Sequence, residues 1–234
     1  MTPNKSQILP HAYHLMRERF GHQNWWPGDT DYEICVGAIL TQNTAWTNVE
    51  KAIRNLKAAN CLTVETVGRM PTDSLAQLLK PAGYFNLKAK RLQAFSQVVT
   101  NEHRGSLTCL FDAPLAVVRN RLLAIHGIGP ETADSILLYA ARKPSFVVDA
   151  YTQRIFLRHR WISEEITYDE LKALCETSLS SPPTNIRNRV DFWNDFHAQI
   201  VAVGKDYCRP KNPKCPECPL HCLLPDQTIP ANAM

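Results

Sequence analysis

The sequence lacks any apolar run that approaches the roughly 20 residues of a membrane-spanning helix. Its first residues, MTPNKSQILPHAY, lack the apolar core of a secretory signal peptide. No segment is rich in strand-forming patterns, and no internal repeat is visible. These absences exclude membrane-spanning, secreted and repeat proteins, and we therefore expect a cytoplasmic protein.

The chain also has little excess of charge of either sign. It contains 26 Lys and Arg against 22 Asp and Glu, which gives a formal net charge of +4 at pH 7. This mild basicity is compatible with a polyanionic partner but does not establish one. Hydrophobic residues make up 44% of the 234 residues, enough for the core of one large or two small domains.

Helical periodicity runs through most of the chain. In residues 47–60, for example, Val49, Ile53 and Leu56 fall on one face and basic residues on another. We predict an all-α protein of roughly ten helices joined mostly by short loops. The predicted helices cover residues 11–20, 32–43, 47–60, 72–83, 87–103, 114–125, 130–142, 151–161, 168–179 and 190–207, and a short extended run covers residues 145–151.

A tight corner interrupts this pattern in the segment HGIGPE. Gly127 and Gly129 permit positive φ and let a ligand approach the backbone closely. Pro130 suits the first turn of a helix, where a missing N–H costs nothing. The corner therefore directs backbone N–H groups and a helix N-terminus at one spot, which predicts an anion site suited to a nucleic-acid phosphate. An ordinary turn between helices with glycine caps explains the pattern equally well.

Several segments together resemble the endonuclease III superfamily of DNA glycosylases. LLAIHGIGPETADSILLYA followed by VVDAYTQRIFLRH is similar to the helix-hairpin-helix of that family and its loop with the catalytic aspartate. AILTQNTAWTNVEKA and PAGYFNLKAKRL are similar to two further family segments. The resemblance implies an all-α, two-lobed fold: a six-helix barrel over residues 30–142, and a discontinuous lobe over residues 1–29 and 143–222 with a metal-cluster loop. A flexible tail is expected over residues 223–234.

The resemblance also implies the roles of the hairpin and of Asp149. The backbone around Ile128 is expected to hold a DNA phosphate, and the predicted DNA contacts are Gly127, Ile128, Gly129, Glu131 and Thr132. Asp149 is the expected catalytic carboxylate. Physical chemistry agrees, because breaking an N-glycosidic bond places positive charge on the sugar, and a fixed carboxylate stabilises that charge and can orient or deprotonate the attacking water. The alternative role for Asp149 is the N-cap of the helix that follows.

Glu131 predicts the type of reaction. Members of the family with lyase activity carry a lysine at this position, and that lysine forms a Schiff base with the sugar and nicks the strand. Glutamate cannot form a Schiff base, and the nearest lysine, Lys143, lies at the far end of the predicted helix. We therefore predict a monofunctional glycosylase with water as the nucleophile.

Three tryptophans are candidates for the pocket of a flipped base. Trp25 and Trp26 stand next to Pro27-Gly28 in a predicted loop, and Trp46 stands at the start of a predicted helix. Together with Glu131 they resemble the 3-methyladenine glycosylase branch of the superfamily. An alkylated purine is cationic, and indole faces attract a cation by roughly 1–2 kcal/mol when desolvated. The alternative is that these rings fill gaps between the lobes.

Lys205, on the last long helix, is expected near the same pocket because a lysine lies there in that branch. A free ammonium would repel a cationic base, so we expect Lys205 to be paired with an acid or modified. An exposed lysine near a helix end is the alternative.

Three further residues are candidates for entering the duplex where the base leaves, namely Gln42, Asn43 and Tyr84. Their alternatives are buried amides that satisfy helix ends and a core tyrosine. A basic run that includes Lys88 and Arg91 is expected to neutralise phosphates or to form an ordinary solvated face.

The eight cysteines fall into two groups of four. Four stand alone, and we expect each to be a small buried hydrophobe; these are Cys35, Cys61, Cys109 and Cys175. The other four crowd together with six, two and three residues between them; these are Cys208, Cys215, Cys218 and Cys222. In a chain without a secretion signal, such a group favours a metal site over disulfides.

Four thiolates suit either tetrahedral zinc or a [4Fe–4S] cluster, and the spacing does not separate the two. The resemblance implies a [4Fe–4S] cluster, although the last gap is shorter than in the family, which slightly favours zinc. His221, inside that gap, is a weak alternative ligand.

The resemblance thus predicts a monomeric base excision repair enzyme that acts on double-stranded DNA containing a damaged base, with no membrane partner. It would be cytoplasmic and associated with the nucleoid through its DNA. Two other interpretations stay open. One is a glycosylase of the same fold for thymine or uracil opposite guanine, or for an oxidised pyrimidine. The other is a non-catalytic DNA-binding iron–sulfur protein in which Asp149 only caps a helix.

Overall fold

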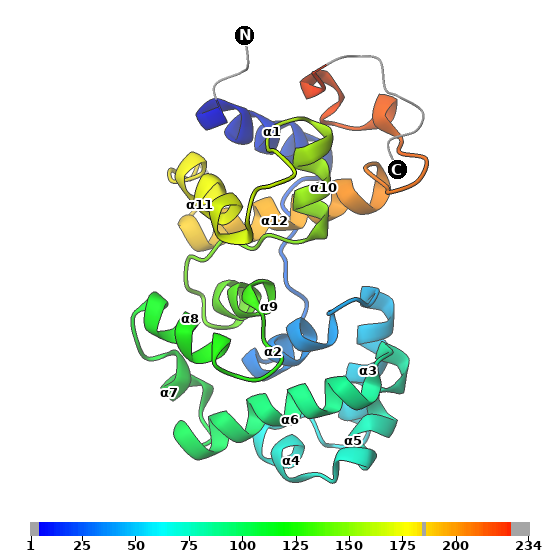
Figure 1. Cartoon of the computed structure of the whole chain (residues 1–234), viewed down its shortest axis with the longest axis vertical. Coiled ribbons are helices and arrows are strands. Elements are labelled where there is room, and N and C mark those ends of the chain that lie inside the picture. The colour runs from blue at the N-terminus through cyan, green and yellow to red at the C-terminus, as the bar shows by residue number, and fades with distance from the viewer. Residues whose placement is uncertain (1–4, 184–185, 226–234) are drawn as a thin grey trace. The chain divides into compact units, whose positions relative to one another are not determined.

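A computed structural model describes residues 5–183 and 186–225 (Figure 1). Within these residues the regular structure is helical and no strand forms, which confirms the predicted all-α class. None of their helices is both long and apolar enough to cross a membrane. The chain divides into two compact units, Trp26–Lys143 and the combination of Met1–Trp25 with Pro144–Met234. The domain boundaries given by the sequence remain predictions, and residues 226–234 of the expected tail lie outside the described residues.

The unit Trp26–Lys143 is built around two helices. Its elements are α2 (Asp31–Leu40), α3 (Trp46–Ala58), α4 (Val64–Arg69), α5 (Thr72–Leu79), a 3-10 turn (Lys80–Ala82), α6 (Phe85–Glu102), α7 (Leu107–Phe111), α8 (Leu115–Leu123), α9 (Pro130–Ser135) and a π-helical turn (Ile136–Ala140). Helix α2 is apolar beyond its acidic first turn and buried along nearly its whole length, as expected of a central helix. Helix α6 packs against α4 and α5.

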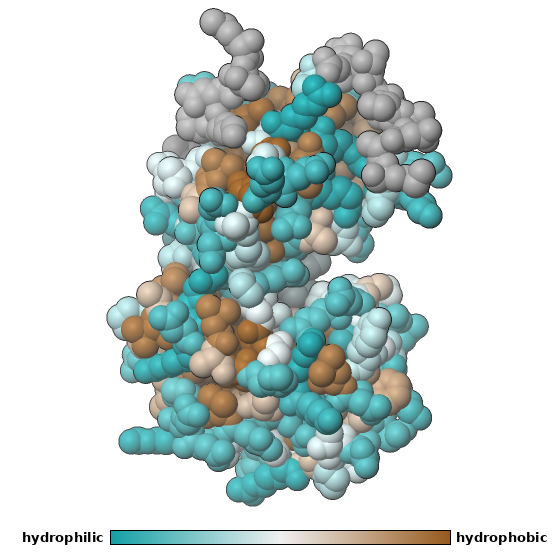
Figure 2. Space-filling view, viewed as in Figure 1, coloured by the Kyte–Doolittle hydropathy of each residue, from teal (hydrophilic) through white to brown (hydrophobic). Residues whose placement is uncertain are grey.

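The second unit consists of α1 (Lys5–Phe20), α10 (Ala150–Arg158), α11 (Tyr168–Ser178), α12 (Arg189–Asp206) and two 3-10 turns (Cys215–Glu217 and His221–Leu223). Helix α12 is buried along most of its length and packs against α1 and α10. Hydrophilic residues cover much of the visible face of each unit (Figure 2).

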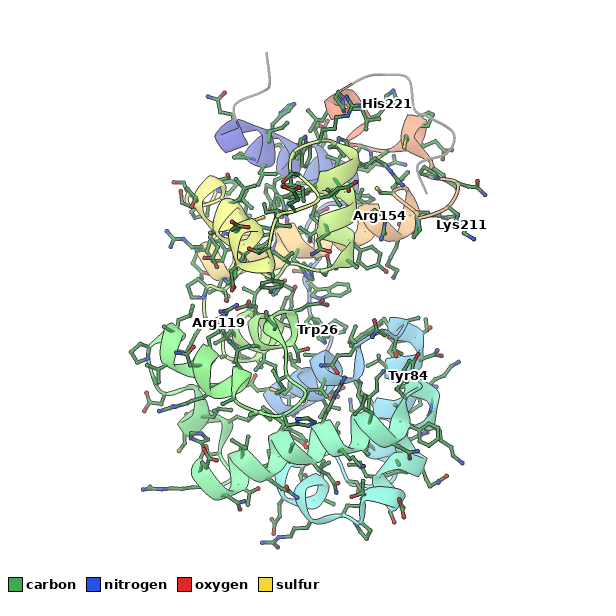
Figure 3. All side chains as sticks on the ribbon, in the orientation of Figure 1. Trp26, Tyr84, Arg119, Arg154, Lys211 and His221 are labelled. Carbon is green, nitrogen blue, oxygen red and sulfur yellow. The ribbon has the colours of Figure 1, made fainter. Side chains whose placement is uncertain are left out.

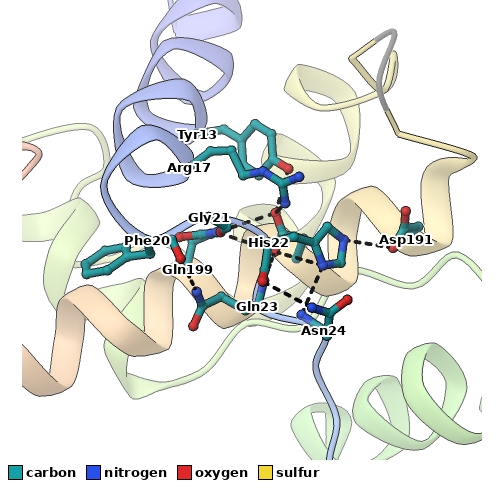
Figure 4. A network of polar contacts seen from close by, with 10 residues as sticks. Tyr13, Arg17, Phe20, Gly21, His22, Gln23, Asn24, Asp191 and Gln199 are labelled. Atoms are coloured by element: carbon teal, nitrogen blue, oxygen red, sulfur yellow. Dashed lines mark hydrogen bonds and ion pairs between the residues drawn. The ribbon is translucent and has the colours of Figure 1, made fainter.

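A buried carboxylate, Asp195, ties α1 and the segment after it to α12. Figure 4 labels Tyr13, Arg17 and Gln23 in the polar network around it. Asp195 accepts hydrogen bonds from the Tyr13 hydroxyl at 2.6 Å, from Nη1 of Arg17 at 2.7 Å and from the backbone N–H of Gln23 at 2.8 Å. Its side chain is inaccessible to solvent. A buried charge is tolerated only when it is paired and fully hydrogen-bonded, and Asp195 meets both conditions.

Some elements differ from the sequence prediction. Helices α4 and α7 were not predicted, because six and five residues are too few to display a helical period. The expected burial of all four isolated cysteines is wrong for two of them, because Cys109 is exposed and Cys61 is half-buried, whereas Cys35 and Cys175 are buried. The segment 145–149 forms no strand and leads into α10 at Ala150.

Candidate functional site

Asp149 stands immediately before α10 and caps it. Its Oδ1 accepts hydrogen bonds from the backbone N–H of Thr152 at 2.7 Å and from the Thr152 hydroxyl at 2.8 Å. Its Oδ2 lies 3.5 Å from Nε2 of His197 on α12. The residue is 9% exposed. The capping role weighed for Asp149 is therefore confirmed, and it occupies only one of the two carboxylate oxygens.

The environment keeps this carboxylate ionised. Burial raises the pKa of Asp149, but the neighbouring imidazole of His197 and the donors of Thr152 together bring the pKa below its usual value. Hydrogen bonds to the charged form favour that form. Asp149 is thus a fixed anion that can stabilise a nearby cation.

The glycine corner joins α8 to α9. Gly127 has φ +87°, whereas Gly129 has φ −92°, so the expectation of positive φ is met only by the first glycine. A Cβ on Gly127 would lie 2.3 Å from Cγ of Arg91, but a Cβ on Gly129 would meet nothing within 4 Å. Pro130 occupies the first turn of α9, as predicted. The backbone at Gly129 is therefore open to close approach by a ligand.

An ion pair braces the two helices of this hairpin. Nε and Nη2 of Arg119 on α8 lie 3.0 and 3.1 Å from the two carboxylate oxygens of Asp134 on α9, and Asp134 is buried. Figure 3 labels Arg119 on its helix. The bidentate geometry is the strong form of an arginine–carboxylate pair.

Two of the predicted hairpin contacts are already engaged within the protein. The N–H of Ile128 donates to the carbonyl of Ile125 at 3.1 Å. The hydroxyl of Thr132 accepts from Nε2 of Gln42 at 3.0 Å. Glu131 is exposed on the first turn of α9.

Gln42 ties the loop after α2 to the hairpin. Besides its contact with Thr132, its Nε2 donates to the carbonyl of Gly127 at 3.0 Å, and its Oε1 accepts from Arg91. All three partners lie in the same unit as Gln42. The amide predicted to enter DNA is therefore bonded to the protein in this structure.

Asn43 and Tyr84 are the exposed members of the predicted DNA-entering set. Asn43 has φ +52° and Tyr84 has φ +45°. Tyr84 stands at the start of α6, where Figure 3 labels it. Its side chain is 72% exposed. An aromatic residue in the left-handed region is uncommon, and such strain often accompanies function. The interpretation of Tyr84 as a core residue is wrong.

Lys88 is not on a solvated face, contrary to the expectation for the basic run. It is 1% exposed, and its Nζ donates to the carbonyls of Leu40 and Ala82 at 2.8 Å each and to the hydroxyl of Thr44. Burial lowers the pKa of Lys88 to about 8, and the charge of Arg91 acts in the same direction. Lys88 fastens the end of α2, the following loop and the turn before α6 to one another.

Trp26 and Trp46 meet in the first unit at right angles. Their ring centroids are 5.1 Å apart with an interplanar angle of 87°, and Trp26 also lies 4.9 Å from the ring of Tyr139. Gly37 of α2 permits this arrangement, because a Cβ there would be 3.3 Å from Nε1 of Trp26. The N–H of Trp46 donates to Glu50 at 2.8 Å. We call Trp26, Trp46 and Tyr139 the aromatic cluster.

The sequence analysis did not predict that Tyr139 belongs to the aromatic cluster, because its position in the apolar run ILLYA is typical of a core residue. Trp25 belongs to the other unit and is half-buried.

Lys205 is exposed near the end of α12, and within the described residues no acid lies within ion-pair distance of its ammonium. The expected pairing of Lys205 with an acid is therefore absent from the described part of the chain.

The cysteine loop follows α12. Cys208, Cys215 and Cys218 line one small pocket together with Arg158 and His221. Nη1 of Arg158 lies 3.1 Å from Sγ of Cys208. Cys208 and Cys215 are buried, Cys218 is half-buried and Cys222 is exposed. Within the described residues these side chains do not converge into a group that encloses a metal ion.

The thiols of this loop nevertheless have the chemistry of metal ligands. Burial raises the pKa of Cys218 to about 11, and it also raises that of Cys215. A coordinating metal would supply the positive charge that buried thiolates need. Arg154 anchors the loop, because its guanidinium donates to the carbonyls of Cys208 at 2.7 Å and Gly204 at 3.1 Å. Figure 3 labels Arg154, Lys211 and His221 around this region.

Comparison with known proteins decides the family. The family model described as "HhH-GPD superfamily base excision DNA repair protein" matches residues 36–181. The chain belongs to this superfamily. The suspected resemblance is confirmed, and the chain is a DNA glycosylase of the HhH-GPD superfamily that acts on DNA in base excision repair.

Relatives and solved structures agree with this assignment. A Methanocaldococcus jannaschii protein designated as a candidate DNA repair glycosylase is 43% identical over 94% of this chain and 97% of its own length. Endonuclease III of Thermotoga maritima is 28% identical over 83% of this chain and 84% of its own length.

Among solved structures, the Helicobacter pylori 3-methyladenine DNA glycosylase bound to 1,N6-ethenoadenine is similar with a TM-score of 0.71 and 30% identity. That match covers 85% of this chain and 95% of the other. A non-covalent endonuclease III–DNA complex has a TM-score of 0.77 and 20% identity, covering 94% of this chain and 95% of the other, and it supports the fold alone.

Proposed function

We propose that this HhH-GPD glycosylase is monofunctional and hydrolyses the N-glycosidic bond of alkylated purines of the 3-methyladenine type. The observation that carries the proposal is the buried, ionised carboxylate of Asp149, held beside α10 and α12, in a chain whose hairpin offers Glu131 where a lyase carries lysine. The two features together support water as the nucleophile that attacks the sugar.

The reaction begins as the bond between the sugar and the damaged base lengthens. Positive charge grows on the sugar, and the carboxylate of Asp149 stabilises it through space. Water then adds to the sugar carbon and loses a proton, for which the carboxylate is the available acceptor. A cationic alkylated purine leaves as a neutral base, so the enzyme needs no strong acid to protonate the leaving group.

Glu131 supports the absence of lyase chemistry. It is exposed on the first turn of α9, where a lysine would have to attack the sugar carbon. A carboxylate cannot form the imine that precedes strand cleavage. The abasic site would therefore leave the enzyme with its phosphodiester backbone intact.

The aromatic cluster supports the choice of base. Indole faces bind a cationic ring by stacking and by cation–π attraction, and Trp26 and Trp46 present two faces at right angles. Glu50, which accepts the N–H of Trp46, adds negative charge beside the cluster. We propose Trp25 and Lys205 as further base-binding residues, on the ground of the family resemblance in sequence. The similarity to the H. pylori 3-methyladenine glycosylase supports this substrate class.

The hairpin and two exposed residues are the proposed DNA contacts. The backbone at Gly129 is open to a phosphate, and Glu131 lies beside it. Tyr84 and Asn43 are exposed and are proposed to fill the gap in the stack that the flipped base leaves. Gln42 would have to exchange its bonds to Gly127 and Thr132 for DNA, or else act by holding the hairpin.

We propose that Cys208, Cys215, Cys218 and Cys222 hold a [4Fe–4S] cluster, with zinc as the alternative. The donor set of four thiols on one loop suits such a cluster, and the guanidinium of Arg158 beside Cys208 compensates its negative charge. The cluster would fold the loop that carries Lys211 and Lys214 and would take no part in hydrolysis.

A panel of duplexes, each with one defined lesion, tests the function. We expect release of 3-methyladenine and related alkylated purines, and strand breaks only after alkali is added. Release of thymine or uracil opposite guanine, or of an oxidised pyrimidine, would instead assign the second glycosylase specificity. Strand nicking without alkali would contradict the monofunctional assignment. Sedimentation of the enzyme with and without DNA tests the proposed monomer.

A further inference from the structure

His197 lies on α12, which packs against α10, and its imidazole is 5% exposed. Most residues of α12 on both sides of it in the sequence are buried as well. A polar ring in such surroundings lowers stability unless it meets a polar partner. The carboxylate of Asp149 faces it, with Nε2 and Oδ2 3.5 Å apart.

The two oxygens of Asp149 are held by different elements. Oδ1 is bound by the N–H and hydroxyl of Thr152 within α10, and Oδ2 faces His197 on α12. The capping hydrogen bonds hold Oδ1 in place. They leave the carboxylate group free to rotate, and this rotation moves Oδ2. The contact from α12 removes that remaining freedom, so the plane of the carboxylate is defined only when both partners are present.

The contact exists because α10 and α12 approach closely. A Cβ on Gly204 of α12 would lie 2.2 Å from Cδ1 of Tyr151, so only glycine admits this tyrosine at the interface. Tyr151 is two residues beyond Asp149. The packing that seats Tyr151 therefore also sets the distance from Asp149 to His197.

We propose that His197 is a positioning residue for base excision, which acts by holding Oδ2 of Asp149 in the orientation that faces the sugar. This inference rests on the proposed glycosylase mechanism. The proximity of His197 also lowers the pKa of Asp149 and so favours the ionised carboxylate. His197 is not proposed to touch the substrate, so its whole effect passes through Asp149.

The test compares His197→Phe with His197→Gln. Phenylalanine fills the space without a donor, whereas the glutamine Nε2 can replace the imidazole Nε2. We expect His197→Phe to lower the single-turnover rate of base release by up to about 100-fold, since small misplacements of a reacting group have effects of this size. Affinity for DNA with an abasic-site analogue should not change. His197→Gln should recover most of the rate.

Val203→Ala, at another buried position of α12, is the matched control for lost packing. It should lower the melting temperature without lowering the rate at a temperature where it remains folded. If His197→Gln is as slow as His197→Phe, or if Val203→Ala lowers the rate as much as His197→Phe does, the positioning role is overturned.

A double-mutant cycle separates this inference from the proposed function. Because His197 acts through Asp149, adding His197→Phe to Asp149→Asn should not slow the enzyme further. A further loss equal to that of the single variant would overturn the positioning role while leaving Asp149 catalytic. Full activity of Asp149→Asn alone would instead overturn the proposed mechanism.

Discussion

The two carboxylate oxygens of Asp149 have different partners. Its Oδ1 caps α10 through Thr152, and its Oδ2 faces His197. A cap alone requires only the first oxygen, and Asn serves nearly as well as Asp in that role. The substitution Asp149→Asn therefore keeps the cap and removes the negative charge, which makes it the informative variant at this position.

The pH dependence of stability tests the electrostatic part of this account. Because the pKa of Asp149 is lower in the folded protein, its charge stabilises the fold above the ordinary carboxyl pKa of about 3.9. This contribution is lost as the pH falls through the lower folded value. The melting temperature of the wild type should therefore exceed that of Asp149→Asn near neutral pH, and the gap should close below about pH 4.

The control is Asp112→Asn, which removes a carboxylate at an exposed position after α7 and should change the melting temperature little near neutral pH. A gap for Asp149→Asn that stays constant or widens in acid would show that the folded protein does not favour the charged carboxylate.

The sequence did not predict the contacts of residues that pack against elements distant in the chain. Tyr139 stands in an apolar run and His197 in a long buried helix, and their neighbours along the chain do not indicate which polar or aromatic side chain each of them meets. The burial of Lys88, in contrast, is predictable from the sequence. Lys88 falls on the same face of α6 as Leu92, Phe95 and Val99, and its place in this apolar stripe predicts burial.

At the scale of elements, the hairpin depends on one conformationally demanding glycine. Gly127 combines φ +87° with the close approach of Arg91, whereas Gly129 has an ordinary φ and open space. Arg91 in turn holds Gln42, so displacing it loosens the tie between the hairpin and the loop after α2. Two neighbouring glycines thus have different physical roles.

Alanine substitutions at Gly127 and at Gly129 should have different effects on stability and on DNA binding. Gly127→Ala should lower the free energy of unfolding by about 1–3 kcal/mol, because of backbone strain and the clash with Arg91. Gly129→Ala should change it by less than about 0.5 kcal/mol. It should, however, weaken binding to undamaged duplex DNA, because its methyl group enters the space proposed for a phosphate. Urea unfolding and fluorescence anisotropy measure the two effects. Equal behaviour of both variants would contradict this division of roles.

The hydrogen bonds of the buried Lys88 ammonium lead to a second prediction at this scale, which concerns stability. Lys88→Met leaves the carbonyls of Leu40 and Ala82 and the hydroxyl of Thr44 without their donor. A buried orphan group costs about 1–3 kcal/mol, so we expect a loss of at least about 2 kcal/mol in urea unfolding. Lys90→Met, at an exposed position of the same helix, is the control and should be near neutral. Weakened DNA binding with unchanged stability would instead make Lys88 a phosphate contact.

The element pattern was predictable where helices are long. Apolar periodicity and the family segments predicted the helical class and most helices, whereas α4 and α7 were too short to give a signal. The conformation after α9 was also beyond a pattern-based prediction, because Ile136–Ala140 winds as a π-helix whose apolar sequence is equally suited to an α-helix.

At the scale of the whole molecule, two compact units share a modest positive charge of +4. An excess this small gives weak general attraction to DNA, so much of the affinity must come from specific contacts. The hairpin and the cysteine loop are the sites proposed for them. The cysteine loop ends the described part of the second unit, and its four thiols are the main feature that periodicity could not explain.

The identity of the metal is a prediction for the intact protein. The purified enzyme should be brown, absorb at the blue end of the visible spectrum and contain iron and sulfide. Cys215→Ser should remove the colour and lower the melting temperature, whereas Cys109→Ser, at an exposed cysteine outside the loop, should leave both unchanged. A colourless protein with one zinc ion per chain would replace the iron–sulfur assignment by the zinc alternative.

The central claim is that the charge of Asp149 stabilises the sugar cation during hydrolysis. The most direct measurement is the single-turnover rate of base release from a duplex with one alkylated purine, for the wild type and Asp149→Asn, together with the affinity of each for the same duplex. We predict that Asp149→Asn binds as tightly as the wild type and releases the base at least about 100-fold more slowly. Release at the wild-type rate by Asp149→Asn would contradict the account.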